Sequence, residues 1–478
     1  MAHSYVPLKK QLTALVLVGL GCVGDIASEP RPPGGGAMPA ALATAIPAAM
    51  PTMSPPTEMA PGASTKPAAG PALPISAATC TPGPGLAPLR RLNRFAYDNM
   101  VRDLLGDETR PAQALPPEDS SGAFSNQAEV LGTSPLLVQG YVDITADIAS
   151  RAVKSRLAKL VPCVPAVGDE ACARKFVETF GRRAWRHPLP PGDVDELMAV
   201  YRVGAAEGDS FAAGIQATIE ALLQAPDFLY LAEVGTPGPN GTRRLTSWEV
   251  AARLAYTLWA TTPDDALLAV AEANQLTEKT QIATAARRLL ADKRARPLIQ
   301  RFAEEWLGIT NVTRVGKDAK VFPMWKGTQP YLFREETRLF FDDLVFADKR
   351  PSALTMFTGR DSFMNAELAA LYGGTGVTGA AFVRTPLPDK RGGMLTQMSL
   401  LATYAKSNQT DPIHRGKFVR LNLLCGELPS APSDVEIKVP ELSAKLTTRE
   451  RFSQHASDPV LCRLPPADGS HRSDLRKL

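Results

Sequence analysis

The chain has 478 residues, of which 44% are hydrophobic and 21% are charged. That length exceeds what one hydrophobic core usually organises, so we expect two or three folded domains. The formal net charge of +4 is small, and Lys and Arg are scattered without forming a basic stripe. These features argue against a nucleic-acid-binding protein.

Residues 1–22 have the pattern of an export signal. Lys9-Lys10 precedes an apolar run, Leu12–Leu20, that is too short to span a bilayer as a mature helix. The following Gly21-Cys22 completes a segment that resembles the lipobox of bacterial lipoproteins, in which the Cys is acylated, although Gly19 replaces the usual aliphatic residue. We therefore expect lipidation of Cys22 and a periplasmic or cell-surface lipoprotein. An ordinary secretory signal with an incidental Cys22, and a cytosolic protein, are the alternatives.

Residues 23–88 form a segment dominated by Pro, Ala, Gly, Thr, Ser and Met, with almost no large apolar side chains. Such a composition cannot bury enough apolar surface to fold, so we expect a disordered tether. A polyproline II chain of this length can reach on the order of 100 Å. That reach suits a protein that stands off a membrane.

Helical patterns predominate from residue 89 onward, and the expected fold class is mainly α, built from multi-helix bundles. Asp193 with Glu196, and Thr246 with Glu249, have the spacing of helix-capping boxes. Only 228–234 and 379–385 look like short strands. The expected helical domains span 89–160, 161–240 and 241–384, followed by a cytochrome-associated helical segment at 385–460 and an aberrant tail at 461–478. The clearest expected helices lie at 89–106, 135–160, 171–186, from 193, 210–231, 248–259, from 261 towards 308, 331–346, 394–404 and 414–425.

Four cysteines are candidates for disulfides. Cys163 and Cys172 flank a turn-rich stretch between two helical patterns, and a disulfide can close such a short loop. We expect this bridge to contribute about 2 to 3 kcal/mol to stability. Cys80 and Cys425 lie beside Pro/Gly segments at the edges of the folded region and form a second, long-range candidate pair. Free buried thiols are the alternative.

Two pairs of adjacent carboxylates are candidates for acid/base chemistry or calcium binding: Glu118-Asp119 in a loop and Asp264-Asp265 at a helix start. The first pair lacks the spaced oxygens of a calcium loop, and the second fits a favourable interaction with the helix dipole. Nucleophile-elbow, phosphate-loop and zinc-protease motifs are missing from the sequence, and with five His in all a metal centre is not expected. We expect core packing for a set of large aromatic residues, namely Trp185, Trp248, Trp259, Trp306 and Phe340.

Four segments resemble a family of exported proteins of planctomycetes and myxobacteria. This family is built from consecutive domains of unknown function and ends in a planctomycete cytochrome-type segment. The order and spacing of the segments match the family from about Leu89 to Pro459. The segments are RRLNRFAYDNMVRDLLGD at 90–107 with LPPEDSSGAFSN at 115–126, FGRRAWRHPLPPGDVDEL at 180–197 with ALLQAPDFLY at 221–230, LTSWEVAARLAYTLWATTPDDALL at 245–268 with RFAEEWLGI at 301–309, and RGGMLTQMSLLATYAKSNQTDPIHRGKFVRLNLLCGELP at 391–429.

The resemblance implies a haem c, attached through a Cys-x-x-Cys-His motif after the segment that ends in Asp458-Pro459. In this chain Cys462 is followed by Arg463 and Leu464 instead, so the motif is missing as written and Cys462 looks like its remnant. With an assumed choice of common high-GC codons, moving the frame by one base turns the tail into Cys-Ala-Ala-Cys-His-Gln-Leu-Met-Asp-Pro-Ile-Gly, the family pattern. We therefore hypothesise a single-base frameshift, in the gene or in its sequencing. A genuine short, disordered C-terminus is the alternative.

An attached haem would need a second axial ligand. His414, His455, Met394 and Met398 are the candidates, although a His placed like His414 is more often a helix cap or a surface residue. We interpret the full-length form as an exported, lipid-anchored electron-transfer protein with a redox partner. The alternative is a non-enzymatic surface module that binds polysaccharide or protein. No pattern assigns an enzymatic activity.

Overall fold

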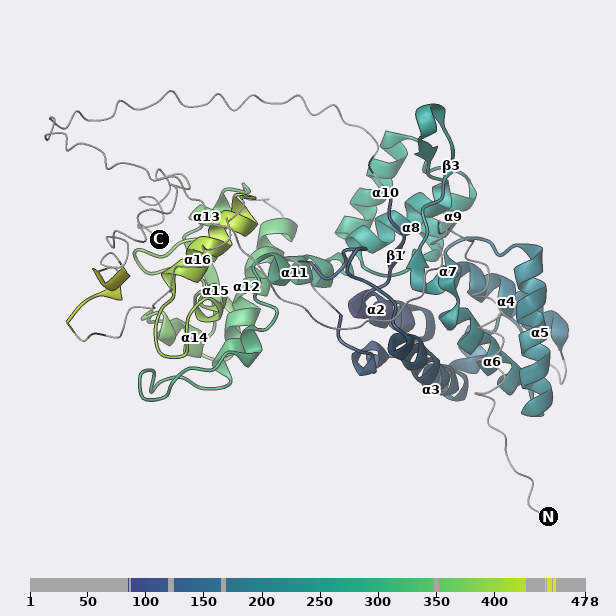
Figure 1. Cartoon of the computed structure of the whole chain (residues 1–478), viewed down its shortest axis with the longest axis horizontal. Helices are drawn as coiled ribbons and strands as arrows, with labels where there is room; N and C mark the ends of the chain where they lie inside the picture. The colour runs from purple at the N-terminus through teal and green to yellow at the C-terminus, as the bar shows by residue number, and fades with distance from the viewer. Residues whose placement is uncertain are drawn as a thin grey trace, which may run out of the picture. The chain divides into compact units, whose positions relative to one another are not determined.

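The computed structural model describes residue 85 and residues 87–118, 124–164, 169–347, 352–426, 443, 445–448 and 450–452. Within these residues the chain is mainly helical and contains three antiparallel two-stranded sheets, which confirms the expected fold class (Figure 1). None of the helices formed by these residues combines the length and apolarity needed to cross a membrane. The predicted signal, the tether up to residue 84 and the aberrant tail lie outside the described residues.

The first group of elements runs from residue 90 to residue 231. The first helix begins at Arg94 rather than Leu89, because Arg90 and Arg91 pair with a later strand and Asn93 then caps the helix. Asp193 does not cap its helix as expected. That helix begins two residues earlier, at Pro191, whose ring suits a first helical turn. The elements are β1 (Arg90–Arg91), α2 (Arg94–Leu105), η2 (Pro111–Ala114), α3 (Pro135–Leu160), α4 (Glu170–Trp185), α5 (Pro191–Glu207), α6 (Phe211–Gln224), α7 (Pro226–Leu229) and β2 (Tyr230–Leu231).

Helices α2 to α7 enclose one hydrophobic core. The predicted apolar stripe of α6 is confirmed, since Ile215, Ile219, Leu222 and Leu223 are all completely buried. Helices α5 and α6 pack closely because Gly214 has no side chain: a Cβ atom there would lie 2.5 Å from the ring of Tyr201. The extended backbone at Ala225 ends α6 just before Pro226, so the expected helix over 210–231 is two helices.

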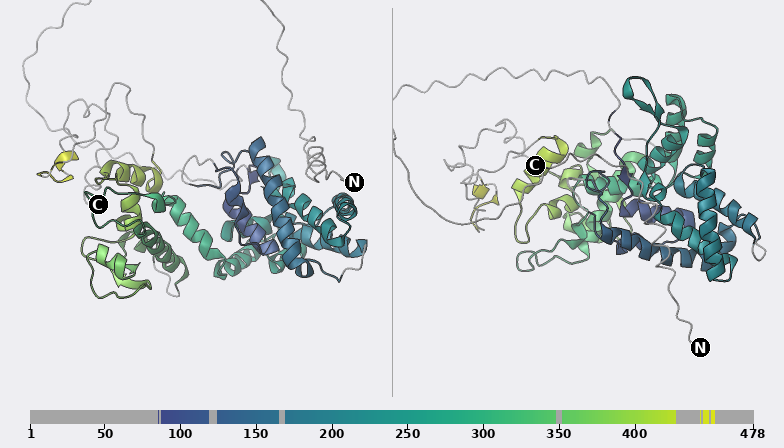
Figure 2. Two further views of the ribbon diagram at one scale, coloured as in Figure 1. Left: turned by 90° about the horizontal axis from the view of Figure 1, so that it is seen from below. Right: turned by 45° about the vertical axis from the view of Figure 1, so that its right-hand side comes forward.

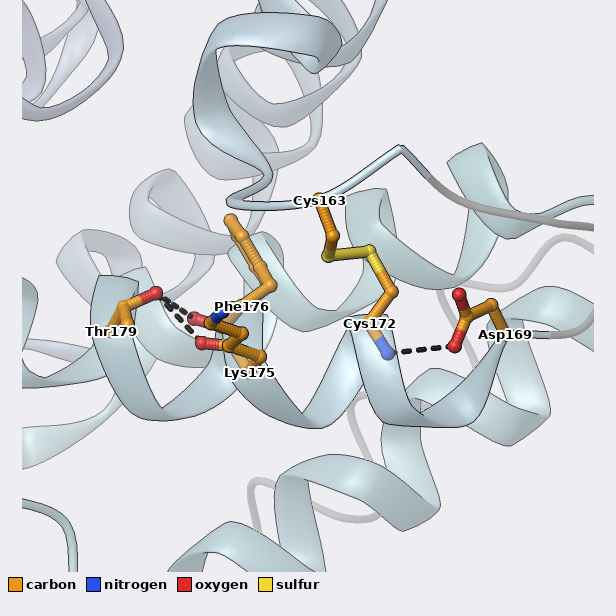
Figure 3. The surroundings of a disulfide bond; sticks show 6 residues. All are labelled: Cys163, Asp169, Cys172, Lys175, Phe176 and Thr179. Carbon is orange, nitrogen blue, oxygen red and sulfur yellow. Dashed lines mark hydrogen bonds between the residues drawn. A yellow bond between two sulfur atoms is a disulfide. The ribbon is translucent and has the colours of Figure 1, made fainter.

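The predicted disulfide between Cys163 and Cys172 is confirmed (Figure 3). The two Cα atoms are 5.9 Å apart, a separation that suits a disulfide. Asp169 accepts a hydrogen bond from the backbone N–H of Cys172 at 2.8 Å and so caps α4. The bridge therefore joins the segment that follows α3 to the first turn of α4.

The second group, from residue 236 to residue 306, has its own core around Trp259. The capping box of Thr246 and Glu249 is present as predicted and starts α8. The indole N–H of Trp259 donates to the carbonyl of Leu289, and the guanidinium of Arg294 lies 3.5 Å from the centre of its ring system. The elements are β3 (Thr236–Pro237), η3 (Pro239–Gly241), β4 (Arg243–Arg244), α8 (Ser247–Leu258), α9 (Asp265–Glu272), α10 (Lys279–Ala291) and α11 (Ala295–Trp306).

The third group, from residue 312 to residue 423, is drawn in green to yellow in Figure 2, and its elements η4, β5, α14 and α15 contact α12. The expected strand near 379–385 is confirmed at 383–386, and its partner over 361–364 was not foreseen. The segment after His414 is a short helix followed by a turn of π-helix. The elements are η4 (Val312–Arg314), α12 (Gln329–Phe346), α13 (Thr355–Thr358), β5 (Asp361–Met364), α14 (Ala366–Leu371), β6 (Val383–Pro386), η5 (Met394–Thr396), α15 (Met398–Thr403), α16 (Pro412–Phe418) and η6 (Val419–Leu423).

Candidate functional site

A cavity of about 930 Å³ lies where residues from three distant parts of the chain meet. One wall comes from Arg94 on α2 and from the nearby loop, including Glu118 and Ser125. A second wall is the C-terminal half of α11 and the turn that follows it. The third wall comes from Tyr404 after α15 and from η6 and Cys425. The cavity is large enough for a small organic ligand.

A strip of three aromatic rings runs along the cavity. Phe302 and Trp306 are four residues apart on one face of α11, and their ring centroids are 5.8 Å apart with an angle of 25° between the planes. Phe124 stacks on Phe302 at 5.6 Å and 10°. The side chain of Phe302 is 44% exposed, so the strip presents an open apolar surface. We call Phe124, Phe302 and Trp306 the aromatic strip.

Glu118 lies at the start of α2 and lines the cavity. Its Oε1 atom accepts the backbone N–H of Arg94 at 2.6 Å and lies 4.0 Å from the guanidinium of Arg91. Burial raises the pKa of this carboxyl group, although the Arg94 N–H and the nearby guanidinium groups oppose the shift. Its expected neighbour in a carboxylate pair, Asp119, lies outside the described residues.

Glu305 ties the aromatic strip to the loop that carries Phe124. Its Oε1 atom accepts the hydroxyl of Ser125 at 2.6 Å, and its Oε2 atom accepts the Ser125 backbone N–H at 3.3 Å. The guanidinium of Arg301 also donates to Glu305. The carboxylate oxygens of Glu305 are therefore largely occupied by hydrogen bonds within the protein.

The opposite wall is held by a reciprocal contact. Trp306 donates its indole N–H to the carbonyl of Asn422 at 3.0 Å, and the side-chain amide of Asn422 donates to the carbonyl of Trp306 at 3.2 Å. Tyr404 donates its O–H to the carbonyl of Leu307 at 3.1 Å. Asn311, by contrast, is exposed, and its side chain bonds no described residue. It therefore offers free polar groups to a ligand.

Asp411 and His414 form a second arrangement with chemical potential, at the start of α16. Asp411 is buried and accepts the backbone N–H of His414 at 3.1 Å, while its other oxygen lies 2.7 Å from Nδ1 of the same residue. Burial works against ionisation of Asp411, but its two bonds with His414 prevail and lower its pKa. The imidazole is 62% exposed. His414 thus caps nothing itself. Instead, it is held by the residue that caps its helix.

Residues late in the described chain contact the segment that directly precedes Asp411. Arg451 is buried and donates to the side-chain carbonyl of Gln409 at 2.9 Å. The hydroxyl groups of Thr410 and Thr448 also meet, at 3.3 Å. The segment that leads towards Cys462 is therefore attached two residues before Asp411.

Several of the predicted site residues have structural roles instead, and others lie outside the described residues. Asp264 caps α9 as expected. Burial opposes its ionisation, but hydrogen bonds from Arg288, Leu267 and Arg294 lower its pKa to about 2. Met394 is fully buried in the core. Besides Asp119, the predicted residues outside the described part of the chain are the lipidation site Cys22, the disulfide candidate Cys80, the axial candidate His455 and the haem remnant Cys462.

Cys425 is a free, exposed thiol that lines the cavity. Because its expected partner Cys80 is not described, the second disulfide stays a prediction. Among the described residues, no group of three or more His, Cys, Asp or Glu is arranged to hold a metal ion.

The expected burial of the tryptophans is correct in part. Trp185 and Trp259 are buried, at 7% and 1% exposure. Trp248 and Trp306 are only half-buried and line cavities instead. The sequence pattern around Trp306 indicated core packing, whereas in the structure its side chain lines a cavity.

Two ionisable residues were missed by sequence reasoning. Glu336 is fully buried on α12, where Ser362 and Tyr372 donate to it. His187 lines a second cavity of about 400 Å³, with Nε2 lying 3.6 Å from a carboxylate oxygen of Asp227 and Nδ1 2.9 Å from the carbonyl of Pro188. The nearby carboxylate of Asp227 raises the pKa of His187. The contacts of Glu336 and of His187 become apparent only in the folded structure.

The fold and these sites define a mainly helical protein with a cavity that joins distant segments. Comparison with family models places four domains of unknown function, of the planctomycete cytochrome type, along the chain in the expected order. They are PSD3 (DUF1587) at 90–154, PSD5 (DUF1595) at 172–233, PSD4 (DUF1592) at 245–373 and PSCyt3 (DUF1588) at 391–464. These matches support the cytochrome-associated family. No curated protein and no solved structure matches the chain.

Proposed function

We propose that this protein is the helical body of an exported, lipid-anchored electron-transfer protein. The observation that carries the proposal is the Asp411–His414 pair. A carboxylate that accepts the Nδ1 proton fixes the tautomer in which Nε2 is an acceptor, as in many metal-binding histidines. The exposed imidazole of His414 would therefore be available to hold a haem iron through Nε2.

This chain offers one imidazole that would hold a haem iron, but it lacks the pair of thiols that covalent attachment requires. The sequence contains no Cys-x-x-Cys-His, so two thioether bonds cannot form. Haem c, where bound, supplies reversible one-electron chemistry. In the frame-restored chain the motif would follow the segment that Arg451 attaches next to Gln409. That attachment limits how far the motif can lie from His414, because an extended chain covers at most about 3.5 Å per residue.

Export and anchoring complete the proposal. Acylation of Cys22 would hold the protein on a membrane, and the Pro/Ala-rich segment after it would let the helical body reach a redox partner. Labelling cells with an alkyne-tagged fatty acid should mark the wild-type protein and leave Cys22→Ser unmarked. Labelling of both proteins, or of neither, contradicts the anchor.

A haemochrome assay tests the redox assignment. This chain and a frame-restored version are produced together with a c-type haem assembly system. We expect the pyridine haemochrome spectrum of a c-type haem only from the frame-restored protein. Resequencing the gene is the companion measurement. Codons that cannot yield the shifted motif would contradict the frameshift, and a haem-free restored protein would contradict the electron-transfer role.

The axial role of His414 has its own test in the frame-restored protein. We expect His414→Ala to change the Soret and near-infrared bands, and Asp411→Asn to change the midpoint potential, because the imidazole loses its oriented acceptor. His187→Ala is the matched control, since His187 lies in the other cavity. Unchanged bands in His414→Ala would remove His414 as a ligand.

A further inference from the structure

We infer that the cavity beside the aromatic strip binds a neutral oligosaccharide, an activity beyond the electron-transfer role. The strip offers a large, open apolar surface, because Phe302 is 44% exposed and Trp306 is half-buried. The C–H face of a pyranose ring is apolar, and it stacks well on such a surface while its hydroxyl groups point sideways. The cavity volume, about 930 Å³, is sufficient for several sugar units.

The three rings of the strip form one continuous apolar surface. Neighbouring centroids are 5.6 Å and 5.8 Å apart, and the planes are inclined by only 10° and 25°. Nearly parallel rings at such separations overlap as an offset stack rather than lie side by side in one plane. The exposed part of the stack can therefore receive one apolar sugar face, while neighbouring units of the glycan reach the polar groups beside it.

Free polar groups lie next to the strip, as recognition of hydroxyl groups requires. The side chain of Asn311 is exposed and bonds no described residue. Glu118 uses Oε1 for the Arg94 N–H, and its Oε2 atom has no hydrogen-bond partner among the described residues. An amide and a carboxyl oxygen together can donate to and accept from vicinal hydroxyl groups.

The charges of the cavity favour a neutral ligand over an anionic one. Arg301 is engaged by Glu305. The guanidinium of Arg94 donates to the carbonyls of Ala112 and Gln113. The two cations that line the cavity are thus occupied, and two carboxyl groups stand beside them. An anionic sugar would lose hydration on binding without gaining a contact with an unpaired cation.

The binding test uses the full chain and three neutral probes, cellohexaose, xylohexaose and mannohexaose, with tri-galacturonate as the anionic probe. Calorimetric titration and tryptophan fluorescence report binding, the latter because Trp306 lies in the strip. We expect at least one neutral probe to bind at millimolar concentration or below, and more tightly than tri-galacturonate. The absence of neutral binding, or tighter binding of tri-galacturonate, overturns the inference.

Variants locate the binding in the cavity. We expect Phe302→Ala to weaken binding by about tenfold, because a stacked ring and its apolar contact are lost. Phe357→Ala is the matched control, since Phe357 is 41% exposed on α13 and does not line this cavity. Asn311→Ala, which removes no bond to a described residue, should weaken binding about threefold. Equal affinities of Phe302→Ala and wild type, with unchanged melting temperatures, overturn the assignment.

Discussion

The O–H of Tyr372 lies 2.9 Å from both carboxylate oxygens of Glu336, and the two side chains are buried together between α12, β5 and α14. The hydroxyl of Ser362 donates to the same carboxylate at 2.6 Å. Burial raises the pKa of Glu336 from 4.5 to about 7, because these donors do not fully replace the lost water. A buried carboxyl group inside the third group of elements thus keeps its proton up to about pH 7.

The first prediction concerns the pH dependence of stability. The folded-state pKa of Glu336 exceeds the unfolded value, so between pH 4.5 and about 7 the unfolded chain releases a proton that the folded protein keeps. Stability therefore falls as pH rises through this window. We expect Glu336→Gln to be less dependent on pH and to gain on the order of 2 to 3 kcal/mol relative to wild type between pH 4.5 and 8.

Urea unfolding at pH 4.5, 6, 7 and 8 measures this difference. Tyr372→Phe is the companion variant, because it removes a donor to the carboxylate and should extend the loss of stability to higher pH. Parallel pH profiles for wild type and Glu336→Gln would show that Glu336 ionises normally.

The second prediction concerns Glu304, whose side chain is 1% exposed. Arg334 donates to both of its oxygens, at 2.7 and 2.8 Å, and Arg338 donates at 2.7 Å. Burial opposes ionisation of Glu304, but these two guanidinium groups prevail and lower its pKa. Glu304→Gln leaves two cations facing a neutral amide, so we expect a loss of about 3 kcal/mol.

Thermal and urea unfolding of Glu304→Gln at pH 7 measure the loss. Glu170→Gln is the control, since the Glu170–Arg202 pair is exposed on the surface and should leave the midpoint nearly unchanged. Similar midpoints for both variants would mean that the buried pair contributes no more than a surface pair.

Local signals were sufficient where a structure depends on neighbours in sequence. Thr246 and Glu249 are three residues apart, and their mutual hydrogen bonds could be predicted from that spacing. Cys163 and Cys172 are nine positions apart. So short a loop keeps the two cysteines close enough for a disulfide in most of its conformations. Asp264 was correctly interpreted as part of a helix start for the same reason.

The cavity could not be predicted, because its residues meet only through tertiary packing. Phe124 and Phe302 belong to distant segments, and nothing in either segment indicates the other. Trp306 lies on the buried side of an amphipathic pattern, which made core packing the expected role. The start of α2 was misplaced for a similar reason, since Arg91 pairs with Tyr230 far along the chain.

The third prediction concerns the disulfide. Replacing Cys163 and Cys172 by Ser should cost about 2 to 3 kcal/mol, because the open loop gains conformational freedom in the unfolded chain. Denaturation with and without a reductant gives the same comparison for wild type. Cys425→Ser is the control, since Cys425 is exposed and takes no part in this bridge. An equal loss in Cys425→Ser would contradict the assignment of the stabilising bridge.

The fourth prediction concerns Lys317, whose ammonium group donates to the carbonyls of Ala402, Ala405 and Lys406 at 3.0, 3.1 and 3.0 Å. Ala402 lies in the last turn of α15, and Ala405 and Lys406 follow the helix in the turn that leads to Asp411. Lys317→Met keeps the apolar stem and removes all three bonds. We therefore expect a loss of about 2 to 4 kcal/mol, because partly buried acceptors are left without donors.

The same change should loosen the turn that presents Asp411 and His414. Hydrogen exchange of the backbone amides over 405–414 should accelerate in Lys317→Met, while exchange in α6 should change only in proportion to global stability. Lys320→Met is the control, because Lys320 is exposed on the same loop and its ammonium donates to no described residue. Unchanged exchange over 405–414 in Lys317→Met would show that the turn is held by its other contacts, such as the hydrogen bond from Arg451 to Gln409.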